Sequence, residues 1–113
     1  MAILQSKTVT ATNKAGGKGE IYIEHILGET ELADKCNMYA KVTVPPGCSL
    51  GEHEHHGNTE TYFILQGKAR YNNNGTEMTI GAGAVTYCPD GEKHAIENIG
   101  DEDLIFMALI IKS

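Results

Sequence analysis

The sequence predicts an all-β fold, either a sandwich or a barrel, from three observations. Short segments alternate apolar and polar residues, as strands with one buried face do. Glycine, proline and asparagine separate these segments at regular spacing, and 13 glycines among 113 residues supply many turns. No segment sustains a helical period of apolar residues, which leaves strands as the main element.

The first part of the chain contains a polar start followed by two alternating strands. Residues 1–19 are polar and are expected to form an N-terminal arm or an edge strand before a single domain at 20–113. Residues 20–27 alternate as a half-buried strand. We interpret His25, on the apolar face of this strand, as a core residue rather than a metal ligand. Residues 38–44 alternate as well, and the prolines that follow end the strand because proline donates no ladder hydrogen bond.

Six more strands are predicted in the second half of the chain, where turn-forming residues separate them. They cover residues 60–65, 68–73, 76–80, 84–88, 94–98 and 104–111. Asn73-Asn74-Gly75 lies between the second and third of these strands and is a strong hairpin signal.

The last predicted strand differs from the others because both of its faces are apolar. One face carries Leu104, Phe106, Ala108 and Ile110, and the other carries Ile105, Met107, Leu109 and Ile111. A strand in the wall of an isolated small barrel should have one face in water. Either the N-terminal arm or a second subunit must therefore cover the second face. We predict a homodimer that packs sheet to sheet.

The overall composition limits the partners that this chain can have. The formal net charge is −6, from 15 acidic and 9 basic side chains, which argues against binding nucleic acid or an anionic membrane. No apolar run approaches the ~20 residues of a spanning helix. The N-terminus lacks the basic and apolar segments of a secretory signal. The three cysteines form no CxxC pair, and we interpret them as reduced thiols of a cytoplasmic protein.

A candidate metal site lies in residues 47–67. His53 and His55 are two residues apart, so an extended strand points both imidazoles to one face. Gly57 and Asn58 allow a turn, after which Glu60 opens the next strand and can fold back beside the histidines. Two neutral imidazoles and a carboxylate that converge suit a divalent metal ion. The alternative for this stretch alone is an exposed, solvated loop rich in histidine and glutamate.

A second stretch, residues 83–98, contributes His94 behind a turn, and it makes the metal interpretation specific. The first stretch has fixed positions at Gly47, His53, His55, Glu60 and Gly67, and the second at Gly83, Pro89, Gly91, His94 and Asn98. Together these two stretches resemble the two signature motifs of the cupin family, and ten positions at set spacing form a strong signal. The resemblance implies a double-stranded β-helix, or jelly-roll, barrel in residues 20–113.

We assign four candidate metal ligands, His53, His55, Glu60 and His94. Three nitrogens and one oxygen suit a divalent transition metal, namely Mn, Fe, Ni, Co or Zn, better than calcium. An octahedral ion with four protein ligands keeps two positions for water, oxygen or substrate oxygens. His56 should point the opposite way from His55.

The alternation of strand residues predicts what lines the cavity beside these ligands. Tyr62 and Ile64 share the face of Glu60, and Ile96 shares the face of His94. Tyr62 is the one polar group among these neighbours, so it is our candidate catalytic residue, able to orient a ligand or move a proton. No spare carboxylate, lysine or arginine is expected to face inward. This favours a small ligand that binds through oxygens directly on the metal.

The resemblance implies a broad range of functions, because dioxygenases, decarboxylases, isomerases and sugar-binding proteins all use this barrel. Our leading hypothesis is a metal-dependent enzyme that acts on a small oxygen-donor substrate. The alternative is a non-catalytic protein that uses its metal to bind a small carbohydrate or organic acid. A structural or storage role is less favoured, because a metal centre with open positions has no use there.

Overall fold

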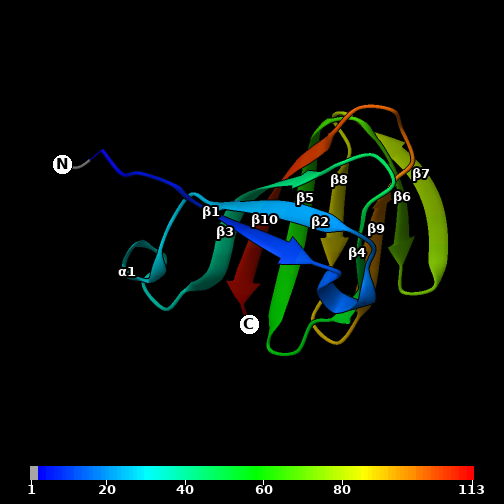
Figure 1. Ribbon diagram of the computed structural model, residues 1–113. Helices are drawn as coiled ribbons and strands as arrows, with labels where there is room; N and C mark the ends of the chain where they lie inside the picture. Colours follow the sequence, from blue (N-terminus) through cyan, green and yellow to red (C-terminus); the bar gives the residue numbers. More distant parts are fainter. Residues whose placement is uncertain (1–2) are drawn as a thin grey trace.

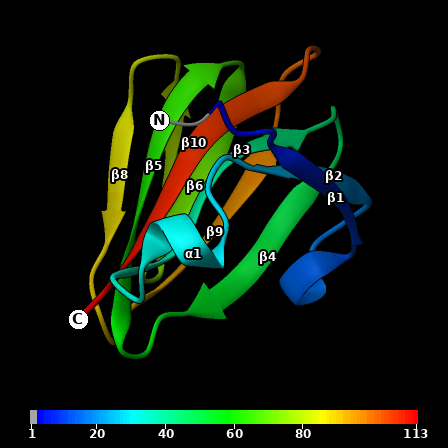
Figure 2. The ribbon, with the colours of Figure 1, turned by 90° about the vertical axis from the view of Figure 1, so that its left-hand side faces the viewer.

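The computed structural model describes residues 3–113, in which ten strands form two antiparallel sheets (Figures 1 and 2). The strands are β1 (Lys7–Thr12), β2 (Glu20–His25), β3 (Cys36–Val44), β4 (Ser49–Glu54), β5 (Asn58–Gln66), β6 (Lys68–Asn73), β7 (Thr76–Gly81), β8 (Val85–Cys88), β9 (Lys93–Asn98) and β10 (Leu104–Lys112). A 3₁₀ turn at Lys14–Gly16 and one helical turn, α1 (Glu29–Leu32), complete the structure. The all-β jelly-roll prediction is confirmed.

The strand order brings segments that are distant in the sequence side by side. The larger sheet has the order β1-β2-β3-β10-β5-β8, and the smaller sheet has the order β4-β9-β6-β7. The first histidine motif is therefore divided, with β4 in one sheet and β5 in the other. The two sheets face each other around a common interior, and helix α1 lies outside them (Figure 2).

The core forms from alternate residues of these strands, because successive side chains of a strand point to opposite faces. In the larger sheet, Val42 pairs with Phe106 and Ala40 pairs with Ala108, and all four are buried. The other buried members of this core cluster are Ile21, Ile23, Val44, Leu50, Tyr62, Ile64, Ala69, Tyr71, Ile96 and Leu104. The eight strands predicted from alternation are all present, with ends that differ by a few residues.

Strand β1 extends the larger sheet at its edge. All six of its residues pair with β2, from Lys7 opposite His25 to Thr12 opposite Glu20. The strand therefore lies beside β2 in the sheet and does not cover the outer face of β10. The first of the two expected ways to cover that face, by the N-terminal arm, is therefore not provided by β1.

The outer face of the larger sheet keeps an apolar surface around β10. Met107 is half-buried there, and its strand neighbour Phe63 is 44% exposed. We call this surface the outer apolar face, and its exposed members are Phe63, Leu65, Val85, Tyr87 and Ile111. Monomeric proteins rarely leave a contiguous apolar surface in water, so this face is a candidate for association.

Candidate metal centre

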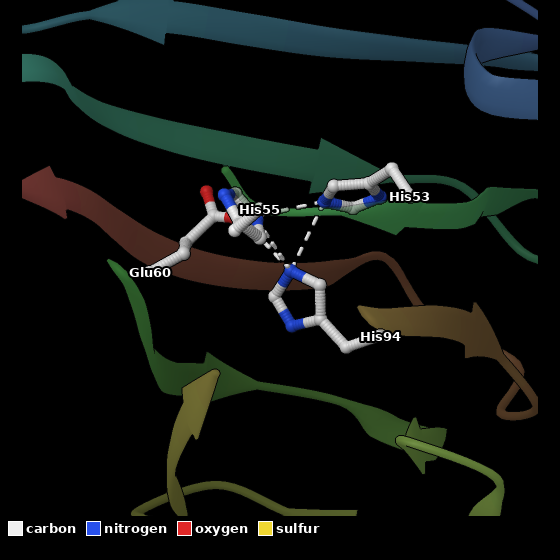
Figure 3. Close-up of side chains that lie close together, drawn as sticks. All are labelled: His53, His55, Glu60 and His94. Carbon is white, nitrogen blue, oxygen red and sulfur yellow. Dashed lines mark hydrogen bonds and ion pairs between the residues drawn. The ribbon is translucent and has the colours of Figure 1, made fainter. Parts of the chain in front are cut away.

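The four candidate ligands come from three strands and one loop, and they meet between the sheets (Figure 3). His53 lies on β4 directly opposite His94 on β9. His55 follows the end of β4, where its backbone N–H donates to the carbonyl of Glu92. Glu60 approaches from β5 of the larger sheet. The chain reversal between β4 and β5, expected at Gly57 and Asn58, thus carries the motif from one sheet to the other.

The spacing of the ligand atoms suits a single ion. One atom from each side chain lies within 4.8 Å of the others. His94 Nε2 is 3.0 Å from His53 Nε2 and 3.1 Å from His55 Nε2, and Glu60 Oε1 is 2.9 Å from His94 Nε2. Two nitrogens that bind one ion at about 2.1 Å and at right angles lie about 3.0 Å apart. The group could therefore hold a divalent metal ion.

Hydrogen bonds to the opposite ring nitrogens orient the three imidazoles. His53 Nδ1 donates to the Gly51 carbonyl at 2.9 Å, and His55 Nδ1 donates to Asn58 Oδ1 at 2.6 Å. His94 Nδ1 is 2.8 Å from the Tyr71 hydroxyl oxygen, which can accept in the same way. A proton on Nδ1 leaves the Nε2 lone pair free, so the geometry favours the tautomer that binds metal.

Sequence reasoning missed these orienting groups. The sequence indicates only a turn at Asn58, and no motif position falls on Tyr71. The alternation of residues 68–73 places Tyr71 on the inner face, a signal that could have pointed to it. Its partner His94 lies on the neighbouring strand, and the register that joins them is a property of the folded sheet.

The protonation states of Glu60 and His94 suit cation binding, whereas His53 holds a proton more readily than a free imidazole does, and a metal ion at its Nε2 atom would have to displace that proton. Burial alone would raise the pKa of Glu60, but hydrogen bonds from His53 and His94 lower it to about 2, so Glu60 is a carboxylate at neutral pH. The pKa of His94 is lowered, because burial disfavours its charged form. Burial acts the same way on His53, but its hydrogen bonds to Glu60 and Gly51 outweigh burial and raise its pKa.

A cavity of about 460 Å³ opens beside the four ligands. His53, His55 and Glu60 contribute to its wall, and most of the remaining wall is apolar. The other lining residues are Lys14, Ala15, Ile21, Ile23, Met38, Val42, Leu50, Tyr62, Ala108 and Ile110. The expectation that no lysine would face this cavity is wrong. The loop between β1 and β2 folds back against β4 and brings Lys14 to the wall.

Tyr62 lines this cavity, next to the ligands. Its ring stacks on His94 with centroids 4.9 Å apart and planes 19° apart. Its hydroxyl is buried and has no hydrogen-bond partner within residues 3–113. Burial raises the pKa of Tyr62 well above 10, so its hydroxyl stays protonated at neutral pH. A buried hydroxyl without a partner is costly and is ready to bind a ligand or a water molecule.

The remaining histidines lie outside the group of ligands. His56 is exposed and pairs with Glu54, as expected from its place beside His55. His25 is half-buried at the end of β2 and does not join the four ligands. Asn98 donates hydrogen bonds to the carbonyls of Val44 and Glu102, which fixes the end of β9.

Residues 40–110 match the family model of the cupin domain. The chain belongs to the cupin family. This cupin is 39% identical over 112 residues to the oxalate-binding protein of Thermotoga maritima, covering 96% of this chain and 93% of that protein. It is 35% identical over 99 residues to oxalate decarboxylase OxdC of Bacillus subtilis, covering 77% of this chain but only 26% of that longer protein.

The solved structures of other cupins support the fold. A crystal structure from Thermotoga maritima, described as a predicted oxalate decarboxylase, superposes with a TM-score of 0.94 at 37% identity and covers 100% of both chains. The cupin domain of Cnp3 from Schizosaccharomyces pombe superposes with a TM-score of 0.75 at 22% identity, covering 82% of this chain and 61% of that chain, which supports the fold alone. Within residues 3–113, no helix is both long and apolar enough to cross a bilayer.

Proposed function

We propose that this cupin binds a divalent transition metal through His53, His55, Glu60 and His94, and uses it to bind a small carboxylate of the oxalate type. The observation that carries the proposal is the convergence of three Nε2 atoms and one carboxylate oxygen at the wall of a mostly apolar cavity. A bound metal would supply a Lewis-acid site for the oxygens of the ligand. The similarity to an oxalate-binding protein over nearly the whole chain supports this ligand class.

The residues around the metal ligands favour binding over turnover. Decarboxylation requires a group that delivers a proton to the product, and a carboxylic acid beside the metal is one such group. Among the described residues that line the cavity, the only carboxylate is Glu60, which is itself a candidate ligand. A protein that holds oxalate without converting it needs no such donor.

The test compares oxalate binding to Mn(II)-loaded and metal-free protein by isothermal titration calorimetry. We expect one binding site per chain in the loaded protein and no measurable binding in the metal-free protein. His94→Ala should lose both metal and oxalate binding, whereas His56→Ala should keep both, since His56 lies outside the ligand group. Equal oxalate affinity with and without metal would contradict the proposal.

Catalysis is the second candidate function, and the buried hydroxyl of Tyr62 favours it. This hydroxyl has no partner within residues 3–113 and belongs to a ring that stacks on a candidate ligand, so it could donate a hydrogen bond or a proton to a bound substrate. Formate and CO₂ production from oxalate, measured with the Mn(II)-loaded protein, separates the two functions. Product formation that Tyr62→Phe abolishes would establish turnover, and binding without product would favour the first proposal.

We also propose that the protein is a homodimer joined through the outer apolar face. Support comes from the exposed side chains of Phe63, Leu65 and Val85 on neighbouring strands, which the N-terminal segment leaves uncovered. A second copy presents the same apolar surface, so a two-fold contact would bury both.

A further inference from the structure

The loop between β1 and β2, residues 13–19, is held firmly against the strand that carries His53. The Ser49 N–H donates to the Lys18 carbonyl at 2.8 Å, and the Lys18 N–H donates to Ser49 Oγ at 2.9 Å. A Cβ atom at Gly51 would overlap the backbone of Ala15 and Gly17. The loop and β4 thus approach closer than any side chain would permit, so the position of the loop is tied to that of the metal ligands.

Lys14 is the residue that this loop brings to the cavity. It lies in the 3₁₀ turn and lines the wall together with His53, His55 and Glu60. Among the described residues that line the cavity, Lys14 is the only lysine or arginine, and most of the others are apolar. Lys14 is itself exposed, so its ammonium group stays partly in water at the edge of the cavity and attracts a bound anion with modest strength.

The charges of the centre show what Lys14 adds. A divalent metal, three neutral imidazoles and the carboxylate of Glu60 sum to one positive charge. A bound monoanion makes this centre neutral, but a bound dianion leaves one negative charge at the wall of an apolar cavity. An uncompensated charge in such surroundings is costly. Lys14 supplies the one positive charge that a dianion needs.

We propose that Lys14 is the specificity-determining residue by which this centre prefers dianions, such as dicarboxylates, over monoanions. The inference rests on the proposed function and deepens it. Lys14 acts on the ligand and not on the metal, because it stands at the wall and is not one of the four converging side chains.

The experiment measures the binding of two probes to Mn(II)-loaded protein by calorimetry. Oxalate is the dianion, and glycolate is a monoanion of similar size that can also offer two oxygens to a metal. We expect Lys14→Gln to weaken oxalate binding about three- to fivefold and glycolate binding less than about twofold, since a partly solvated charge contributes modestly. Lys14→Arg should restore most of the oxalate affinity. Mn(II) affinity should stay unchanged in both variants.

The matched control is Lys18→Gln, which removes the same charge from the same loop. Lys18 holds the loop through its backbone and does not line the cavity, so both affinities should stay within about twofold of wild type. An unchanged oxalate affinity in Lys14→Gln, or equal weakening of both probes, would overturn this inference alone. Loss of Mn(II) binding in that variant would also overturn it. A wild-type protein that binds Mn(II) but no oxalate would overturn the proposed function as well.

Discussion

At the scale of single residues, each imidazole of the candidate metal centre has a hydrogen-bond partner at its Nδ1 atom. Gly51, Asn58 and Tyr71 each face the Nδ1 atom of one imidazole, at 2.9, 2.6 and 2.8 Å. These contacts fix the orientation of each ring, so that the three Nε2 atoms point toward one another. Such partners typically change metal affinity by 10–100-fold when they are removed.

The hydroxyl of Tyr71 provides a sharp test of this arrangement. Tyr71→Phe keeps the buried ring and removes only the oxygen that faces His94 Nδ1. We expect Mn(II) affinity to fall about tenfold, because the His94 ring loses its orienting partner. Calorimetric titration with Mn(II) measures the change.

The control for this test is Tyr22→Phe, which removes a hydroxyl from a side chain that is 39% exposed on β2. Its Mn(II) affinity should equal that of wild type. If Tyr71→Phe also keeps full affinity, His94 is oriented by packing alone, for instance by its stacking on Tyr62.

At the scale of elements, the loop of residues 13–19 and strand β4 form one unit. The pairing of β4 with β9 shifts register between Leu50 and His53, so Gly51 lies in an irregular stretch of the strand. Two glycines, Gly17 and Gly51, face each other there across backbone atoms. The irregular stretch lets the Gly51 carbonyl accept from His53 while the loop packs beside it.

Gly51→Ala tests the importance of this close approach for stability. The added methyl group would overlap the backbone of Ala15 and Gly17, so the loop or the strand must move. We expect the free energy of unfolding to fall by about 1–3 kcal/mol. Urea denaturation of the metal-free protein, followed by circular dichroism, measures this loss.

Gly81→Ala is the matched control, because a Cβ atom there meets only the Gly67 carbonyl oxygen at 3.6 Å, an ordinary contact distance. Its stability should change by less than about 1 kcal/mol. Equal stability of the two variants would mean that the loop can move away from β4 at little cost in free energy. Such a loop would not hold Lys14 in a fixed position at the cavity.

At the scale of the whole molecule, the larger sheet has an outer surface with exposed apolar side chains. Around β10 the larger sheet exposes Phe63 and Val85, which pair across β5 and β8, and Tyr87 lies farther along the same strand. These three side chains are 44%, 66% and 56% exposed, so nothing in residues 3–113 buries them. An exposed apolar surface of this kind is typical of association sites.

Phe63→Lys tests the proposed homodimer. The substitution places a charge at the centre of the outer apolar face, where it would be buried on association and would lack a partner. We expect the wild-type protein to be a dimer of the 12.2 kDa chain at micromolar concentration and the variant to be a monomer. Light scattering coupled to size-exclusion chromatography measures the two masses.

Met78→Lys on β7 is the control, because Met78 is 41% exposed on the smaller sheet and lies outside the proposed interface. It should remain dimeric. A monomeric wild-type protein would remove the homodimer proposal.

The absence of a nucleic-acid partner and the cytoplasmic location stay predictions from composition.

The sequence by itself determined the fold class, eight of the ten strands in residues 3–113 and the four residues that converge. Alternation is local, and a period of two residues reports which side of a strand is buried without reference to its neighbours. The resemblance of the ten spaced positions to the cupin motifs added the barrel and the candidate metal ligands.

Only the tertiary structure decided which groups stand behind and beside the ligands. Tyr71 reaches His94 through strand register, and Lys14 reaches the cavity because a loop 39 residues before His53 packs on β4. The position of Lys14 depends on the close approach of the loop backbone to β4 at Gly17 and Gly51, which no local sequence pattern indicates. The alternation of apolar residues carries no information on which distant segments will be in contact. Those tertiary contacts set the charge and shape of the site.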